Sequence, residues 1–273
     1  MGVVNITPDS FSDGGAYSTT DKVFSHIDKL LEDGIDIIDI GAESTAPFND
    51  PIDANEEISR FDQLLLRSEN LFRLNHLTLS IDTYRPEVFE YVAKTIFSKS
   101  PKANILWNDV SGVFDKKTVT VLEKFPAVHY VYSHNFSPTR EETSNHMSFV
   151  KKISGDELIK EVISNFQGVL GSPFASRIIL DPCFGFSKDH DQNIFLLDHM
   201  SDLLAPFNRE QQFLVGISRK SFLQKLTGKE KTDLKIKESE YYHVDYLKKI
   251  LLSCKERHFT FRIHDPQIMK LLI

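Results

Sequence analysis

Short apolar runs that end in clusters of polar residues recur eight times along this chain. Several of these runs are rich in Ile and Leu on both sides, as in 35–40 and 178–180. Runs of this kind predict strands of a parallel sheet that is covered on both faces. The runs lie at about 2–6, 35–41, 77–82, 104–108, 127–133, 177–181, 212–217 and 259–263.

Amphipathic segments of helical length separate these runs. Asp21 is expected to cap a helix that continues to about Leu31. Asp53 or Asn55 is expected to cap a second helix, which would continue to about Leu74. Further helices are expected at about 86–97, 115–124, 155–168, 191–205 and 237–256, with a short last one after Pro266.

Strands and helices that alternate in this way predict the α/β class. Eight strands joined by right-handed crossovers favour a TIM (β/α)8 barrel, here with a short final helix. A doubly wound open sheet is the alternative, because periodicity alone does not separate the two architectures. The 273 residues fit a single domain spanning 1–273. Since the chain begins almost inside its first strand, one hypothesis is that this domain was excised from a longer chain.

Composition narrows the classes of partner. A formal net charge of −7 argues against a nucleic-acid partner, which usually requires a basic face. No apolar run approaches the length of a membrane span, so no membrane partner is expected. The two cysteines, Cys183 and Cys254, cannot form a disulfide framework, and they fit a reducing, cytoplasmic location.

Polar residues of complementary chemistry stand at the carboxyl ends of the predicted strands. In a barrel these ends meet at one mouth, where barrel enzymes place their chemistry. Asp82 and Asp181 would accept hydrogen bonds, and Asn108 can both donate and accept. The cations at this mouth could hold an anion such as phosphate. The combination fits a ligand with a heterocyclic head that carries N–H groups and with a phosphorylated tail. The set comprises Asn5, Asp39, Glu43-Ser44-Thr45, Asp82, Asn108-Asp109, His134, Asp181, Ser218-Arg219-Lys220, Arg262 and His264.

Two long motifs carry a resemblance to a known family. Asn5-Ile6-Thr7-Pro8-Asp9-Ser10-Phe11-Ser12-Asp13-Gly14-Gly15 resembles the first signature of the dihydropteroate synthases, and Asp39-Ile40-Gly41-Ala42-Glu43-Ser44-Thr45 resembles the second. Five shorter family motifs follow in the right order, and together they cover nearly the whole chain. They are Ser80-Ile81-Asp82-Thr83, Asn108-Asp109-Val110-Ser111-Gly112, Asp181-Pro182 through Gly185-Phe186, Ser218-Arg219-Lys220-Ser221 and Arg262-Ile263-His264-Asp265.

The resemblance implies a TIM-barrel transferase of folate biosynthesis. Such an enzyme joins 6-hydroxymethyl-7,8-dihydropterin pyrophosphate to p-aminobenzoate and releases pyrophosphate. Mg²⁺ is the implied cofactor, bound through the side-chain oxygen of Asn5. The implied catalytic residues are Asp82, Lys220, Arg262 and His264. The implied substrate-binding residues are Thr45, Asp82, Asn108, Asp181, Lys220, Arg262, Ile263, His264, Phe11, Asp13, Pro47 and Ser221.

Within this set the resemblance divides the roles. The pterin ring would be held by Asp82, Asn108, Asp181 and Lys220. Arg262 and His264 would grip the pyrophosphate, and Thr45 would contact substrate from the second loop. The aminobenzoate slot would be shaped by Phe11, Asp13, Pro47 and Ser221.

The chain departs from the family pattern at several places. Ala46 stands where the family usually has an Arg that contacts the pyrophosphate, and Arg60 or Lys188 is the expected substitute. Cys183 stands where Gly is common, and it is interpreted as a passive side chain near the pocket. His134 is interpreted as a structural residue near the pocket floor. The segment 237–249 replaces a run of small residues in a region that the family uses for its dimer interface.

These departures keep two other functions open. A non-catalytic or weakly active pterin-binding paralogue would fit Ala46 and the altered last third of the chain. A methyltransferase that uses methyltetrahydrofolate shares the barrel and the pterin pocket, but the loop Thr7-Pro8-Asp9-Ser10-Phe11 argues against it. The expected partners are the two small-molecule substrates. A homodimer and a fusion to another folate-pathway enzyme are the further hypotheses.

Overall fold

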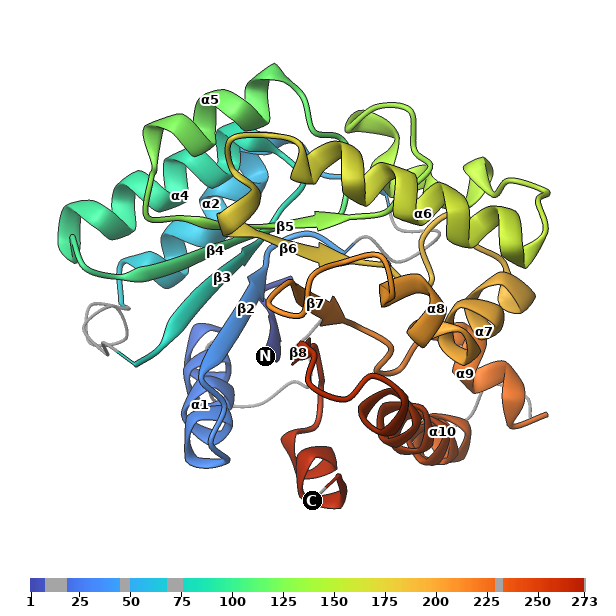
Figure 1. The fold of residues 1–273 in the computed structure, drawn as a ribbon. Coiled ribbons are helices and arrows are strands. Elements are labelled where there is room, and N and C mark those ends of the chain that lie inside the picture. The colour runs from blue at the N-terminus through green and yellow to red at the C-terminus, as the bar shows by residue number, and fades with distance from the viewer. Residues whose placement is uncertain (8–18, 45–49, 68–75, 229–232, 273) are drawn as a thin grey trace.

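Eight parallel strands form one sheet in which each strand pairs with the next along the chain. The computed structural model describes residues 1–7, 19–44, 50–67, 76–228 and 233–272. The first and last strands meet, because Val3 N donates to Ile263 O (3.1 Å) and Ile263 N donates to Met1 O (3.0 Å). The sheet therefore closes on itself, and the predicted TIM barrel is confirmed over the open sheet (Figure 1).

The predicted strands all form, with ends that differ from the expected ones by a few residues. They are β1 (Gly2–Asn5), β2 (Ile37–Gly41), β3 (Thr78–Asp82), β4 (Asn104–Asp109), β5 (His129–Ser133), β6 (Ile178–Asp181), β7 (Gln212–Val215) and β8 (His258–Phe261).

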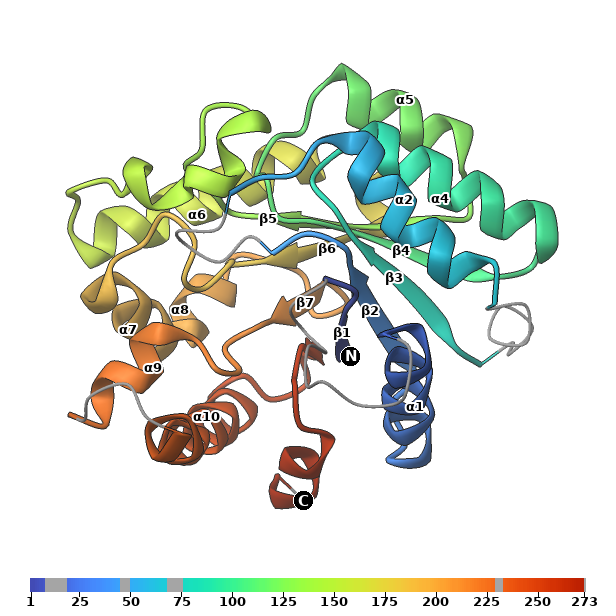
Figure 2. The same cartoon turned by 180° about the vertical axis from the view of Figure 1, so that it is seen from behind.

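Helices surround the strands, and α2 packs beside α4 (Figure 2). The α-helices are α1 (Thr19–Glu32), α2 (Ala54–Leu65), α4 (Pro86–Lys99), α5 (Lys116–Lys124), α6 (Gly155–Leu170), α7 (His190–Asp198), α8 (Met200–Leu204), α9 (Ser221–Leu226) and α10 (Asp233–Ser253). The 3-10 helices are η2 (Glu141–Phe149), η3 (Ala175–Arg177) and η4 (Pro266–Leu271). None of the helices in the described part of the chain is long and apolar enough to cross a membrane.

Several helix boundaries differ from the expected ones. Asp21 lies in the first turn of α1, where its charge suits the helix dipole, rather than at the cap. Asp53 caps α2 by accepting a hydrogen bond from Glu56 N (2.8 Å). This helix ends at Leu65 and not near Leu74, since Arg67 N already bonds Leu64 O in a tighter turn.

The expected helix at 191–205 is two helices. His199 leaves the helical region (φ −112°, ψ 28°), so α7 ends before it and α8 begins after it. Three further elements were not expected, α9, η2 and η3. The expected last helix after Pro266 is the 3-10 helix η4, which Asp265 caps through Gln267 N (2.9 Å).

Apolar and polar side chains are layered along the inside of the barrel. A cluster separate from the larger strand–helix core is formed by Met1, Leu106, Val131, Ile179 and Leu214. Asn108 and Asp181 stand two positions beyond Leu106 and Ile179, and side chains two apart share one face of a strand. The two-residue period of the strands thus places an apolar layer inside the barrel. Polar side chains lie next to this layer, at the carboxyl ends of the strands.

Candidate active site

Four polar side chains from β2, β3, β4 and the end of β8 form one hydrogen-bonded group. Arg262 Nε donates to Asp39 Oδ2 (2.6 Å), and Arg262 Nη2 donates to Asp82 Oδ2 (2.7 Å). Asn108 Nδ2 donates to both oxygens of Asp39 (3.2 and 3.3 Å). The structure therefore brings together four of the residues singled out from the sequence, with Asp82, Asn108 and Arg262 around the fully buried Asp39.

Burial and neighbouring charge perturb the first carboxyl of this group. Burial, together with the charge of Asp39, raises the pKa of Asp82 to about 7, while Arg262 opposes the shift. Asp82 thus titrates near neutral pH, so its charge can change when a cationic or N–H-bearing ligand arrives.

A second acceptor and a lysine face this group, the first from the end of β6 and the lysine from the loop between β7 and α9. Asp181 Oδ1 accepts a hydrogen bond from Cys183 N (2.7 Å). Burial raises the pKa of Asp181 to about 6, and burial lowers the pKa of Lys220. Lys220 Nζ lies 4.5 Å from the ring centroid of Phe186, a cation–π geometry that holds the ammonium over the β6 loop.

His264 lies beside the same cations and is held by Ser218. His264 Nδ1 is 3.0 Å from Ser218 Oγ, which also accepts from His264 N (3.3 Å). Burial, reinforced by the charges of Arg262 and neighbouring cations, lowers the pKa of His264 to about 3, so its imidazole is neutral at physiological pH. Because Ser218 Oγ already accepts from the backbone, its hydroxyl proton can go to Nδ1, which leaves Nε2–H as a donor.

The remaining residues expected at the site divide into three groups. The side chain of Ile263 lies in the hydrophobic core, and its backbone closes the barrel, so it does not join the polar group. Asn5 ends β1 with an exposed side chain, and Ser221 is the first residue of α9. The predictions for Phe11, Asp13, Thr45 and Pro47, and the departure at Ala46, lie outside the described residues.

The comparisons with known proteins agree with this geometry. The model of the family described as "Pterin binding enzyme" matches residues 1–246. The chain is 33% identical over 241 residues to a dihydropteroate synthase type-3 from Escherichia coli, covering 86% of this chain and 83% of that protein. The chain belongs to the pterin-binding enzyme family.

Two further relatives of this pterin-binding enzyme extend the comparison. A crystal structure of dihydropteroate synthase from Clostridium difficile, determined in the presence of pteroic acid, superposes with a TM-score of 0.77 at 28% identity and covers 100% of this chain and 93% of that one. A mitochondrial folate synthesis bifunctional protein from Arabidopsis thaliana is 33% identical over 251 residues. This match covers 85% of the chain and 42% of the bifunctional protein.

An arginine that the family motifs do not include holds both flanks of the second loop. Arg85 pairs with Glu43 on one flank and donates to Ile52 O (2.6 Å) on the other. Arg85 Nη1 also pairs with the buried Glu57 of α2 (2.6 Å), and Tyr84 Oη donates to Glu43 (2.9 Å). Sequence reasoning missed Arg85 because its partners come from separate segments that only the fold brings together.

A second missed arginine fixes the loop after β4. Arg140 Nη1 donates to Asp109 Oδ2 (2.6 Å), to Ser111 Oγ (3.0 Å) and to Tyr84 O (2.9 Å). Tyr130 Oη donates to the same oxygen of Asp109 (2.9 Å). Arg140 therefore balances the charge of this fully buried carboxylate. Asp109 thus belongs to a different hydrogen-bonded group from Asn108, its neighbour in the sequence.

The β6 loop has an unusual backbone and a lysine that stabilises it. Cys183 (φ 55°), Gly185 (φ 82°) and Ser187 (φ 50°) all adopt left-handed conformations. Lys188 Nζ donates to three carbonyl oxygens, those of His134 (2.8 Å), Phe186 (3.1 Å) and Cys183 (3.3 Å). All three protons of this buried ammonium are thus engaged, so the expectation that Lys188 replaces the missing loop arginine is wrong.

The other expected substitute lies closer to the second loop. Arg60 Nη1 donates to Ala42 O (2.8 Å), and Arg60 Nε donates to Glu56 (3.0 Å). Its guanidinium therefore sits beside the start of this loop.

Burial raises the pKa of the Cys183 thiol to about 12, which fits a passive side chain. His134 is buried, and neither ring nitrogen bonds any other residue that the structure describes, which fits a structural role.

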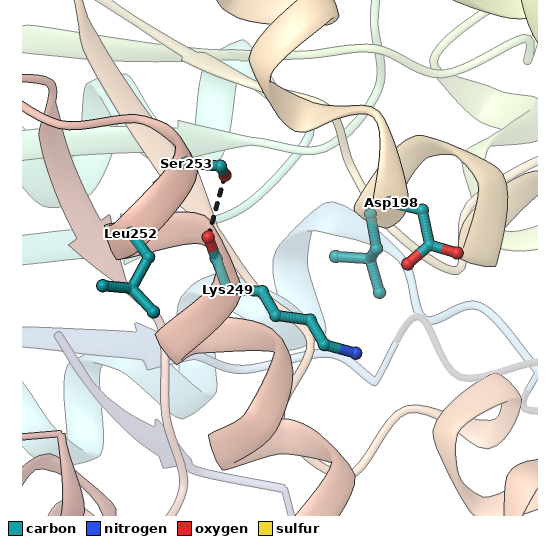
Figure 3. A pocket seen from close by; sticks show the side chains of 5 residues that line it. Asp198, Lys249, Leu252 and Ser253 are labelled. Carbon is teal, nitrogen blue, oxygen red and sulfur yellow. Dashed lines mark hydrogen bonds between the residues drawn. The ribbon is translucent and has the colours of Figure 1, made fainter.

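Two surface depressions in the described part of the chain lie at the other end of the barrel. One is lined by Leu197, Asp198, Lys249, Leu252 and Ser253, between α7 and α10 (Figure 3). The second opens at the amino ends of β5, β6 and β7, where His129, Ile178 and Gln212 begin these strands. Neither includes a member of the polar group, and residues at this end of a barrel usually serve stability.

Proposed function

We propose that this chain is a dihydropteroate synthase, which joins 6-hydroxymethyl-7,8-dihydropterin pyrophosphate to p-aminobenzoate and releases pyrophosphate. The observation that carries the proposal is the joint placement of carboxylate and amide acceptors with Arg262 at one mouth of the barrel. The membership of the pterin-binding family and the dihydropteroate synthase relatives support the same reaction.

The acceptors fit the edge of a pterin ring. Asp82, Asp181 and Asn108 can accept from the amino group and ring N–H groups of the heterocycle. Lys220 can donate to its carbonyl oxygen from the opposite side, where Phe186 holds the ammonium. In this partly enclosed mouth such hydrogen bonds discriminate strongly, because a mismatched ligand leaves buried groups unpaired.

The cations fit the leaving group. Two nitrogens of Arg262 are fixed by carboxylates, whereas Nη1 makes no hydrogen bond with any residue described. Nη1 and the Nε2–H of neutral His264 would donate to the pyrophosphate as the C–O bond to the pterin methylene breaks. The amine nitrogen forms the new C–N bond and then releases a proton. An arylamine attacks as a neutral nucleophile, so orientation and leaving-group stabilisation would supply most of the rate.

Asn5 fits the role of a magnesium ligand. Its exposed amide oxygen at the end of β1 is a hard donor with no hydrogen bond to a described residue, and Mg²⁺ commonly takes few protein ligands besides water and substrate phosphates. When bound, the ion would neutralise charge on the pyrophosphate. Among the described residues no group of three or more His, Cys, Asp or Glu side chains is placed to hold a metal, which suits an ion held largely by substrate.

The test is a turnover assay with purified protein, both substrates and Mg²⁺. We expect pyrophosphate release that depends on p-aminobenzoate and falls about 100-fold or more in Arg262→Ala. The absence of release at every protein concentration would refute the proposal.

A pterin-binding paralogue without turnover is the second candidate, and Ala46 favours it because an anion-binding Arg is missing. Calorimetry with 6-hydroxymethylpterin separates the two functions. A synthase should bind the pterin more tightly when pyrophosphate is present, whereas tight binding without this enhancement would favour the paralogue.

A further inference from the structure

Asp39 lies at the centre of the polar group, although it belongs to none of the expected substrate contacts. It accepts hydrogen bonds from Ser80 Oγ (2.6 Å), Arg262 Nε (2.6 Å) and Asn108 Nδ2 (3.2 and 3.3 Å). An ionised carboxylate can only accept, so every group that faces Asp39 must present a donor. The amide of Asn108 is therefore turned with its nitrogen toward Asp39.

The other end of this amide has no partner among the residues that the structure describes. Asn108 Oδ1 is buried and accepts no hydrogen bond from any of them. Because Nδ2 is fixed on Asp39, Oδ1 must point the opposite way. A buried carbonyl oxygen without a donor is unfavourable, so this atom is expected to meet a donor on a ligand.

We propose that Asp39 is a positioning residue that sets the hydrogen-bond polarity of the mouth. By holding Asn108 Nδ2, it presents Oδ1 to the substrate and thereby selects a heterocycle edge that carries N–H donors, such as the 2-amino group of a pterin. The inference rests on the proposed function and adds the reason why an amino edge is preferred to a carbonyl edge.

The substitution Asp39→Asn tests this because Arg262 decides how the new amide is oriented. Arg262 Nε can only donate, so the oxygen of the new amide stays on that side. Its nitrogen then faces Ser80 and Asn108, and Ser80 Oγ is able to accept. Asn108 Nδ2 keeps only the oxygen on the Arg262 side as an acceptor (3.3 Å) and lies 3.2 Å from the new nitrogen, so we expect the Asn108 amide to turn its oxygen toward that nitrogen and its own nitrogen toward the ligand. The mouth then presents a donor where the wild type presents an acceptor.

The exchange variant carries both Asp39→Asn and Asn108→Asp, and it should again present an acceptor to the ligand. The new amide at position 39 donates to one carboxylate oxygen at position 108, and the second oxygen faces the ligand as an acceptor. The net charge of the group is unchanged. Asp109→Asn is the matched control, since Asp109 is an equally buried carboxylate that also pairs with an arginine, but its partners are Arg140 and Tyr130.

The measurement is calorimetric binding of 6-hydroxymethylpterin and of its 2-oxo analogue, 6-hydroxymethyllumazine, with thermal unfolding as a folding control. We expect the wild type to prefer the pterin by about 100-fold. Asp39→Asn should lower this preference by about 10-fold or more. In this variant the Asn108 nitrogen faces the 2-amino group of the pterin, and both groups are hydrogen-bond donors. The exchange variant should restore most of the preference, and Asp109→Asn should keep it.

Each outcome has a definite meaning. A folded Asp39→Asn variant with the wild-type preference, or with equal losses for both ligands, would overturn the inference. If Asp39→Asn does not fold, the exchange variant decides, and loss of preference there would overturn it. Wild-type protein that binds both ligands equally would overturn this inference alone, whereas wild-type protein that binds neither would overturn the proposed function as well.

Discussion

Arg262 Nε lies 2.6 Å from Asp39 Oδ2, although 223 positions separate the two residues in the chain. Asp39 lies in the second strand and Arg262 directly follows the eighth, so this contact forms only when the barrel closes. Arg262 also reaches Asp82, the last residue of the third strand (2.7 Å). Closure of the barrel and assembly of the site are therefore one event.

Stability should depend on pH through Asp181. Burial raises its folded-state pKa to about 6 from an ordinary value of 3.8, so the folded form binds the proton more tightly than the unfolded form. This contribution is largest below pH 3.8 and is lost as the pH rises through 6. Between pH 5 and 7.5 the free energy of unfolding should fall by about 1 kcal/mol from this group. Urea unfolding of Asp181→Asn should lack this part of the slope, and an unchanged slope would contradict the assignment.

Arg85 should matter more for stability than an exposed arginine does. Removal of its side chain in Arg85→Ala leaves Glu43 and the buried Glu57 without a counter-charge, which should cost about 3–5 kcal/mol of unfolding free energy. Arg67→Ala is the control, because its pair with Asp21 is exposed and should contribute less than about 1 kcal/mol. Urea unfolding checks both variants. Adding Glu57→Gln to Arg85→Ala should recover part of the loss, and no recovery would argue against repulsion between the carboxylates.

Lys188 and Arg60 should differ in what their removal affects. Lys188→Met leaves three loop carbonyls without their donor, so we expect a loss of about 2–4 kcal/mol in unfolding free energy. Arg60→Ala should cost less, about 1 kcal/mol, because it removes one donor to a part-buried carbonyl, but it should raise the KM for the pterin pyrophosphate severalfold, because this guanidinium lies beside the second loop. Urea unfolding and steady-state kinetics on both variants test the contrast. Equal kinetic effects without a stability difference would contradict it.

Asn5 should affect metal dependence without affecting the fold. Its side chain is exposed, so Asn5→Ala should leave the unfolding midpoint almost unchanged. The Mg²⁺ concentration for half-maximal turnover should rise about 10-fold, because one hard oxygen ligand is lost. Magnesium titration of the turnover rate makes the measurement. An unaltered titration curve would remove Asn5 from the metal site.

The sequence predicted the strands well because their signal is local. A run that is apolar on both sides has few alternatives to a buried strand in an α/β protein, and the polar residue at its end follows from the strand period. Asp82, Asn108 and Arg262 could therefore be placed at one mouth before their contacts were known.

The contacts that organise this mouth could not be predicted in the same way. Arg85 and Arg140 find partners in several separate segments, and neither stands in a recognisable pattern. The break at His199 was also missed, because the apolar pattern continues on both sides of it. Lys188 looked like a free cation in the sequence, and only its three carbonyl partners reveal a structural role.

The most direct test of the account is a crystal structure with 6-hydroxymethylpterin and pyrophosphate bound. We expect the pterin edge to lie against Asp82, Asn108 and Asp181, with pyrophosphate oxygens near Arg262 Nη1 and His264. A pterin bound elsewhere, for example in the depression between α7 and α10, would contradict it.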